Sequence, residues 1–209
     1  MNTDPRPTTP SAALERLMEG NRRFLTDAHP EGDISASRRM DLAREQHPFA
    51  TLVGCSDSRV GPEFLFGAGL GDLFIVRAAG SLLDDYGFGS VMFALERLDV
   101  PLIMVLGHQN CGAVAAAVES VVSETPVEGA MAPLVDAIVP AVHEVSAGSD
   151  DDDVRRRVGH ASIRRTVRAL RESTEPSLRV ALDTGAVGVV GAFYSLASGA
   201  VEIVDPLPG

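Results

Sequence analysis

The sequence predicts an α/β protein with a mostly parallel central β-sheet flanked by helices, and with an N-terminal helical arm. Short apolar runs, typical of strands buried on both faces, recur along the chain. Stretches with apolar residues at helical spacing separate these runs. Strands that alternate with helices usually form a parallel sheet covered on both faces. Because neither a linker nor a repeat divides the 209 residues, we expect a flexible tail over residues 1–10 and a single domain over residues 11–209.

The N-terminal half of the chain begins with helices and continues with strands. Residues 11–27 place apolar side chains at helical spacing, and Ser11 can act as the N-cap of this helix. After a loop, residues 36–46 are predicted to form a short polar helix. The runs 49–54 and 73–76 are short and apolar, which predicts two buried strands.

The C-terminal half continues the alternation. Helical spacing predicts four helices, the last of them Arg-rich and amphipathic, over residues 86–98, 113–122, 129–147 and 154–172. A third buried strand is predicted over residues 101–106, and residues 186–194 and 200–204 are interpreted as a strand pair. The acidic run 150–153 is expected to be a solvated helix start or loop rather than a metal site.

Composition argues against several classes of function. The 18 basic and 29 acidic residues give a net charge of −11, which disfavours binding to nucleic acid because phosphates are repelled. All the basic residues are arginine, which removes catalysis by lysine. Two cysteines cannot make a disulfide-rich scaffold, and no apolar run reaches the ~18–20 residues of a membrane span. We expect a cytoplasmic protein that binds neither nucleic acid nor membranes.

Metal-capable side chains gather in two short loops, each directly after a predicted buried strand. Cys55-Ser-Asp57-Ser-Arg59 follows one strand, and His108-Gln-Asn-Cys111 follows another. In an open parallel sheet, the loops beyond the carboxyl ends of the strands form the ligand crevice, so these side chains can converge. Two thiolates, an imidazole and either a carboxylate or water make a tetrahedral set that suits Zn²⁺. The sequence therefore predicts a zinc site with Cys55, Asp57, His108 and Cys111 as candidate ligands.

The same residues admit plainer interpretations. Buried cysteines are common core residues, and an isolated His-x-x-Cys is weak evidence for a metal. A redox dithiol is another possibility, although the close Cys-x-x-Cys spacing is missing. Asp57 and Arg59 could also form an ordinary ion pair at the surface.

Together, Cys-Ser-Asp-Ser-Arg at 55–59 and His-x-x-Cys-Gly at 108–112 resemble the β-class carbonic anhydrases. The similarity extends over most of the chain, from residues 17–24 to the late strand at 190–194. The resemblance implies a catalytic domain over residues 11–209 that binds one zinc ion per subunit and acts on a small molecule, carbon dioxide or bicarbonate. It also implies an obligate dimer, as a homodimer or a homotetramer.

The resemblance assigns roles to the residues of the first loop. It implies reversible, zinc-dependent hydration of carbon dioxide to bicarbonate and a proton, through zinc-bound hydroxide. Asp57 is placed to accept a hydrogen bond from that hydroxide, and Arg59 can hold the carboxylate by a bidentate pair. Asp57 could instead bind the zinc and displace the water, which is the closed state of some family members.

The resemblance also implies substrate contacts. The Gln46 amide and the Gly112 backbone N–H contact bicarbonate, while Phe74, Ala79 and Phe93 line a small apolar pocket suited to an apolar gas. Some of these residues come from the partner subunit in this interpretation. The N-terminal helix around residues 14–24 is likewise expected to pack on the partner rather than on its own subunit.

Two other functions compete with this one. A hydrolase of carbonyl sulfide or carbon disulfide shares the zinc loops, so the substrate depends on pocket shape and access. A zinc-stabilised interaction protein without catalysis is the second alternative. Asp57 and Arg59 argue against it, because structural zinc sites use four protein ligands and need no further carboxylate.

Overall fold

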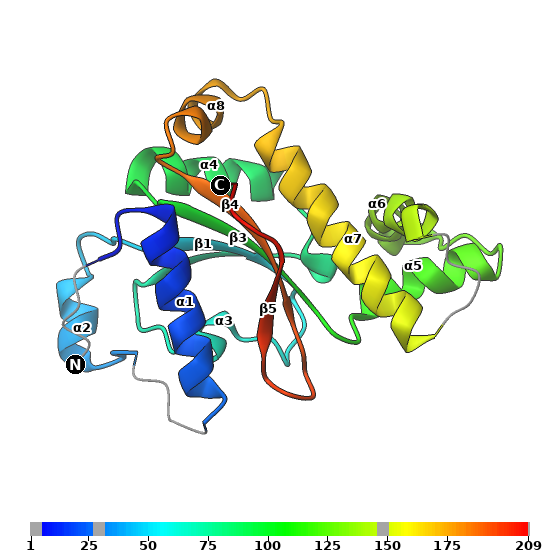
Figure 1. Ribbon diagram of the computed structural model, residues 1–209, viewed down its shortest axis with the longest axis horizontal. Helices are drawn as coiled ribbons and strands as arrows, with labels where there is room; N and C mark the ends of the chain where they lie inside the picture. The colour runs from blue at the N-terminus through cyan, green and yellow to red at the C-terminus, as the bar shows by residue number, and fades with distance from the viewer. Residues whose placement is uncertain (1–5, 27–31, 146–150, 209) are drawn as a thin grey trace.

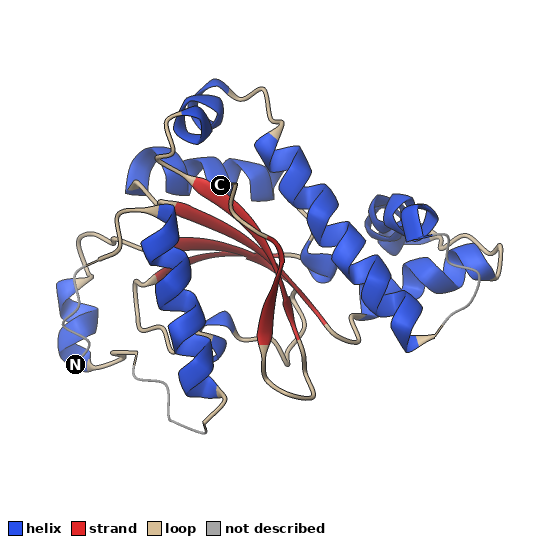
Figure 2. Ribbon diagram, in the orientation of Figure 1, coloured by secondary structure: helices blue, strands red, loops and turns tan. Residues whose placement is uncertain are grey.

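The computed structural model describes residues 6–26, 32–145 and 151–208. Five strands form one sheet in the order β2-β1-β3-β4-β5 (Figures 1 and 2). The strands are β1 (Ala50–Gly54), β2 (Leu73–Arg77), β3 (Leu102–His108), β4 (Gly188–Tyr194) and β5 (Val201–Asp205). All neighbouring strands are parallel except β5, which pairs antiparallel with β4. The predicted fold class is confirmed.

The helices follow the predicted alternation, with short additions. They are α1 (Pro10–Phe24), α2 (Ala36–Asp41), α3 (Pro62–Leu65), α4 (Asp85–Leu98), α5 (Gly112–Val122), α6 (Ala132–Val145), α7 (Asp152–Arg171) and α8 (Pro176–Asp183). Two 3₁₀ turns, η1 (Ala79–Ser81) and η2 (Gly129–Met131), precede α4 and α6. The polar helix predicted over 36–46 ends at residue 41, and α3 and α8 were not predicted.

The helix starts show where side-chain caps decide the boundary. The Thr9 side chain accepts a hydrogen bond from the Ala12 N–H, so Thr9 caps α1 and the expected cap Ser11 lies inside the helix. The acidic run caps α7, because the Asp151 side chain accepts from the Val154 N–H at 2.9 Å. Residues 1–5 of the predicted tail and Asp150 of the acidic run lie outside the described residues.

Helix α1 lies against one face of its own sheet (Figure 1). Ala13 and Leu17 are fully buried and belong to the same apolar cluster as Leu52, Leu102 and Met104 of the strands. The expectation that this helix packs on a partner subunit instead of its own is therefore wrong. The apolar side of an amphipathic helix has to be buried, and the uncovered face of its own sheet is the nearest apolar surface.

Helices α4, α7 and α8 cover the opposite face of the sheet. Val91 of α4, Val167 of α7 and Leu178 of α8 are buried in one cluster with Ile103 and Val105 of β3. Strand β3 is consequently buried along its whole length, as expected for an apolar run without alternation. The residue at its carboxyl end, where the candidate zinc ligands lie, is therefore held by packing on both sides.

A third apolar cluster lies beyond the carboxyl ends of the parallel strands, where α5, α6 and the start of α7 pack together (Figure 1). Ala117 of α5, Ile138 of α6 and Val158 of α7 are fully buried there, in the same cluster as Cys55 and Cys111. Both candidate thiol ligands are thus enclosed by apolar helices on one side.

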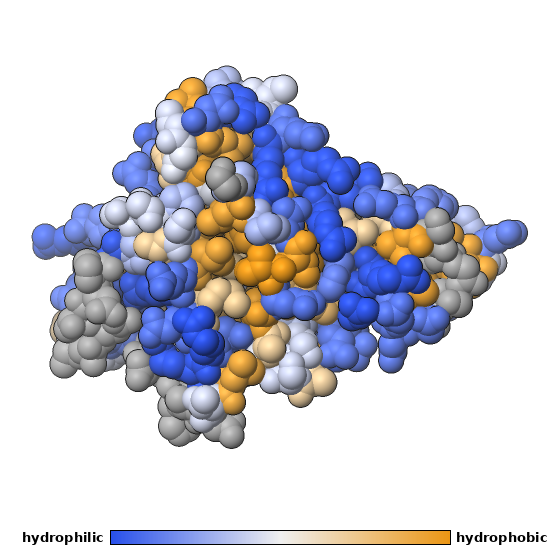
Figure 3. Space-filling model, in the orientation of Figure 1, coloured by the Kyte–Doolittle hydropathy of each residue, from blue (hydrophilic) through white to orange (hydrophobic). Residues whose placement is uncertain are grey.

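One face of the molecule is polar over the outer sides of α1 and α7 and more apolar along β5 between them (Figure 3). Ile203 and Val204 of this edge strand are only partly buried. Among the described residues, no helix has the length and apolar character needed to cross a bilayer.

Candidate functional site

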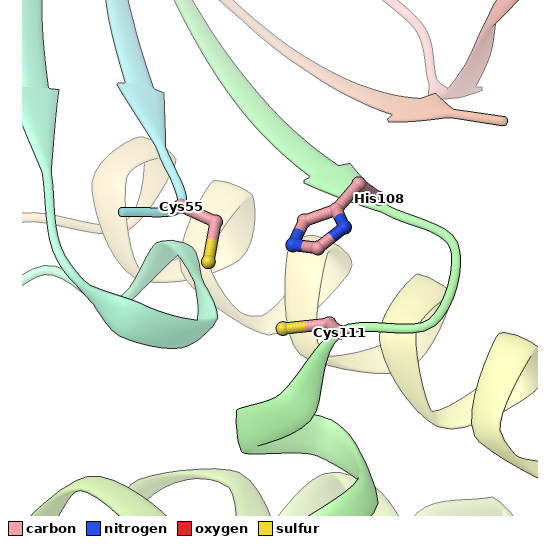
Figure 4. A group of neighbouring side chains, drawn as sticks. All are labelled: Cys55, His108 and Cys111. Atoms are coloured by element: carbon pink, nitrogen blue, oxygen red, sulfur yellow. The ribbon is translucent and has the colours of Figure 1, made fainter. Parts of the chain in front are cut away.

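Cys55, His108 and Cys111 converge at the carboxyl end of the sheet. Cys55 follows β1, His108 ends β3 and Cys111 immediately precedes α5. Strands β1 and β3 are hydrogen-bonded neighbours with Gly54 opposite Leu106, which brings the two loops together. The two sulfur atoms and an imidazole nitrogen all lie within 4.8 Å of one another, and Figure 4 shows these atoms pointing toward one another. All three residues are buried.

The hydrogen bond of His108 determines which ring nitrogen is available to a metal. His108 Nδ1 lies 2.9 Å from the Gln109 carbonyl oxygen, which can only accept, so Nδ1 carries the proton. Nε2 therefore has a lone pair, is buried, and has no hydrogen-bond partner among the described residues. A buried, unpaired acceptor aimed at two sulfurs fits a metal ligand, and the carbonyl bond is the usual outer contact of such a histidine.

The two thiols face each other, so that ionisation of one of them is favoured over ionisation of both. The Cys111 thiol donates a hydrogen bond to Cys55, which lowers the pKa of Cys55, and the same contact raises the pKa of Cys111. The Gly80 N–H also donates to Cys55 Sγ, at 3.4 Å. Thiolates are the form that binds zinc, and two thiolates with one imidazole match a zinc site that keeps one position open.

Asp57 and Arg59 form a bidentate ion pair next to the three ligands. Arg59 Nε donates to Asp57 Oδ1 at 2.9 Å, and Arg59 Nη2 donates to Asp57 Oδ2 at 2.7 Å. The Arg59 backbone N–H also donates to Oδ1, at 2.9 Å. Asp57 Oδ2 lies 3.9 Å from His108 Nε2. Hydrogen bonds from Arg59 hold the pKa of the Asp57 carboxyl well below its usual range, so the group is ionised.

Arg77 holds the backbone of the first loop in place, a role that the sequence analysis did not assign. Its Nε donates to the Cys55 carbonyl at 2.8 Å, and its Nη2 donates to the carbonyls of Asp57 and Val60 at 2.7 and 2.9 Å. Since the partners are main-chain carbonyls, no pattern of residue types marks this contact. Arg77 is the last residue of β2 and lies opposite Gly54 of β1, which is the one signal that could have suggested it.

Two of the predicted substrate-contact residues lie close to the ligands. Gly112 is the first residue of α5 and follows Cys111 directly. Ala79 begins the turn η1, next to Gly80, whose N–H contacts Cys55 Sγ.

The other three predicted substrate residues lie elsewhere in the subunit. Gln46 is exposed and precedes β1, so it lies at the end of this strand opposite to Cys55. Phe74 of β2 and Phe93 of α4 stack with their ring centroids 6.1 Å apart, and Phe93 is 50% exposed.

Similar sequences of known proteins support the assignment of this site. The family model described as "Carbonic anhydrase" matches residues 50–201, which include both loops. "Carbonic anhydrase 2" of Mycobacterium tuberculosis is 36% identical over 200 residues, covering 95% of this chain and 94% of the relative. "Carbonic anhydrase" of Mycolicibacterium smegmatis is 34% identical over 201 residues, covering 94% of each chain.

Solved structures show the same fold. A tetrameric β-carbonic anhydrase from Sordaria macrospora superimposes with a TM-score of 0.72 at 21% identity, covering 95% of this chain and 94% of that one. Coccomyxa β-carbonic anhydrase in complex with acetazolamide gives a TM-score of 0.74 at 24% identity, covering 93% and 87%. With the cysteine and histidine ligands in place, these matches show that the chain belongs to the β-class carbonic anhydrases.

Proposed function

We propose that this protein catalyses the reversible hydration of carbon dioxide to bicarbonate and a proton, with zinc as its cofactor. The observation that carries the proposal is the buried group of two sulfurs and one imidazole nitrogen within 4.8 Å, beside an ionised carboxylate held by arginine. The carbonic anhydrase names of the most similar relatives support the same reaction.

Cys55, His108 and Cys111 would hold the metal. Zinc held by these residues would supply Lewis-acid activation of a water molecule near neutral pH. A set of three protein ligands is typical of catalytic rather than structural zinc sites. Two thiolates cancel the charge of the metal and weaken it as a Lewis acid, so a further group that orients the nucleophile is needed.

Asp57 supplies that orienting group in the proposed mechanism. Its Oδ1 is occupied by two donors of Arg59, while Oδ2 takes one Arg59 donor and retains a lone pair on the side of His108. That lone pair can accept a hydrogen bond from the attacking oxygen and direct it at the carbon of the substrate. If Arg59 released the carboxylate, Asp57 would become available as a further ligand for the metal.

Substrate binding requires more than one subunit in this proposal. The Gly112 N–H, beside Cys111, would donate to bicarbonate, and Ala79 would form part of an apolar pocket for carbon dioxide. Gln46 would act in the site of a second copy of the chain, because it lies at the far end of β1 in its own subunit. The half-exposed pair of Phe74 and Phe93 would complete the apolar lining once a second copy covers it.

We propose a homodimer or homotetramer acting in the cytoplasm. The apolar residues exposed on the isolated subunit include Ile34, Met40 and Phe64, each at least 65% exposed, which a second copy would cover. The tetrameric structural neighbour is an assembly of the same fold.

Stopped-flow measurement of carbon dioxide hydration by the zinc-loaded protein tests the function. We expect rapid turnover by the wild type and none above background by His108→Ala, which lacks the imidazole ligand. Parallel measurement with carbonyl sulfide and carbon disulfide identifies the substrate class. Hydrolysis of either sulfur compound without hydration of carbon dioxide would replace the proposed reaction by that of a related hydrolase.

A further inference from the structure

The turn that follows β2 makes three hydrogen bonds around Cys55. The Ala78 N–H donates to the Gly54 carbonyl at 3.1 Å, and the Ser56 N–H donates to the Ala78 carbonyl at 3.3 Å. Two residues further along the turn, the Gly80 N–H donates to Cys55 Sγ at 3.4 Å. The backbone before Cys55, the backbone after it and its sulfur atom are therefore all bound to one turn.

This turn has an unusual backbone conformation. Gly80 has a φ of +77° and Ser81 a φ of +55°, so two successive residues are left-handed. A Cβ at Gly80 would lie 2.9 Å from Ile138 Cδ1 and 3.2 Å from Ala113 Cβ, so the left-handed backbone and the close neighbours together favour glycine. For Ser81, which has a Cβ, the left-handed conformation is unfavourable and must be held by other interactions.

The Ser81 side chain provides such an interaction. Its Oγ donates to the Leu106 carbonyl at 2.7 Å, and Ser81 is only 4% exposed. Leu106 lies on β3, two residues before His108, and β1 lies between β2 and β3 in the sheet. The Ser81 hydroxyl thus connects the turn to β3, the strand that carries the candidate ligand His108.

We propose that Ser81 is a positioning residue of the zinc site, whose hydroxyl holds the turn so that the Gly80 N–H donates to the sulfur of Cys55. A hydrogen bond to a ligand sulfur orients it and stabilises it in the form that binds the metal. Loss of such outer contacts typically lowers metal affinity about 10–100-fold. The inference rests on the proposed role of Cys55, His108 and Cys111 as zinc ligands.

Two substitutions separate the hydroxyl from backbone strain. Ser81→Ala and Ser81→Gly both remove the hydrogen bond to Leu106, but glycine adopts the left-handed conformation without steric cost. An effect shared by both variants therefore belongs to the hydroxyl. Ser90→Ala is the matched control, because Ser90 Oγ donates to the Tyr86 carbonyl at 2.8 Å on an exposed part of α4.

The readouts address the metal rather than turnover. The first is the rate at which zinc passes from the folded protein to a chelator. The second is the wavelength of the thiolate-to-cobalt charge-transfer band after replacement of zinc by Co²⁺. We expect both Ser81 variants to lose zinc at least about tenfold faster than wild type and to shift the band, while Ser90→Ala matches wild type in both measurements.

The outcomes distinguish this inference from the proposed function. Wild-type protein that holds zinc, with zinc loss and band unchanged in Ser81→Gly, would overturn the role of Ser81 and leave the ligands standing. A change confined to Ser81→Ala would also overturn it, because the hydroxyl would then only offset the strain of a Cβ at its own position, and the turn would stay in place without the bond to Leu106. Wild-type protein that binds no zinc would contradict the ligand assignment and, with it, this inference. If Ser81→Ala fails to fold, Ser81→Gly alone decides.

Discussion

Replacing the Asp57 carboxylate by an amide tests the mechanism most sharply. Asp57 Oδ1 accepts two hydrogen bonds from Arg59 and Oδ2 accepts one, all at 2.7–2.9 Å. An amide has a single oxygen and an NH₂ group that only donates. If its oxygen takes the Oδ1 position, the NH₂ group meets the Nη2 donor of Arg59 and presents no acceptor to the nucleophile. If it is flipped, the NH₂ group meets two donors, so neither orientation preserves the pair.

The expected size of the effect follows from this geometry. Loss of a positioned proton-accepting group typically lowers the rate about 10²–10⁴-fold. The metal and its three ligands remain in Asp57→Asn, so we expect kcat/KM to fall about 10²–10³-fold, which corresponds to about 3–4 kcal/mol in the barrier. The kcat/KM of Asp57→Ala should fall by a similar factor, because neither alanine nor asparagine offers the nucleophile the acceptor that the carboxylate provides.

Stopped-flow hydration and metal analysis on the same samples provide the assay. Zinc content should equal that of wild type in both variants. Asp183→Asn is a suitable control, because Arg179 Nη2 binds Asp183 Oδ1 at 2.8 Å in another arginine–aspartate pair, on α8 and away from the site. Asp57→Asn with full zinc and a rate within about threefold of wild type would refute the assigned role.

Three further predictions concern the metal, the core and pH. Purified protein should contain about one zinc per chain, and Cys55→Ser should lose it, as metal analysis will show. Leu17→Ala, which removes a fully buried side chain from the contact of α1 with the sheet, should lower the free energy of unfolding by about 2–5 kcal/mol in denaturant titration. Because the pKa of Asp57 is lowered by folding, its ion pair stabilises the protein above the unfolded pKa of about 3.9. The difference in unfolding free energy between wild type and Asp57→Asn should thus be constant from pH 8 to about pH 5, and shrink as pH falls further.

Each of these predictions has a clear contrary result. Cys55→Ser that keeps zinc at the wild-type level would remove this residue from the ligand set. Unchanged stability of Leu17→Ala would show that α1 does not depend on its own sheet. A stability difference that shrinks between pH 8 and pH 6 would mean that the carboxyl of Asp57 is not held in its ionised form.

The sequence predicted the convergence of side chains correctly where metal-capable residues directly follow a buried strand. Apolar runs without alternation located β1 and β3, and the carboxyl ends of neighbouring parallel strands necessarily meet at one edge of a sheet. The convergence of Cys55, His108 and Cys111 follows from this rule. The bidentate pair of Arg59 with Asp57 was one of two predictions, because the same spacing also fits an ordinary surface pair, and the structure shows that Nε and Nη2 form it.

Hydrogen bonds from side chains to main-chain carbonyl groups could not be predicted from the sequence. Arg77 binds three carbonyl groups, and Ser81 binds one across β1, so neither contact has a complementary residue type that could be recognised. The short helices α3 and α8 were missed because four and eight residues give too little periodicity, although Pro62 and Pro176 mark their first turns. The packing of α1 was misjudged because a helix pattern shows which side is apolar and not which surface covers it.

The placement of both cysteines at the metal site has a practical consequence. The sequence contains two cysteines, and both are unpaired, buried and members of the ligand group. Any thiol reagent added to the native protein therefore reports on this one place, without background labelling elsewhere. Metal release can be followed as the appearance of two titratable thiols per chain, and a cysteine introduced anywhere else can carry a label selectively while zinc shields the native pair.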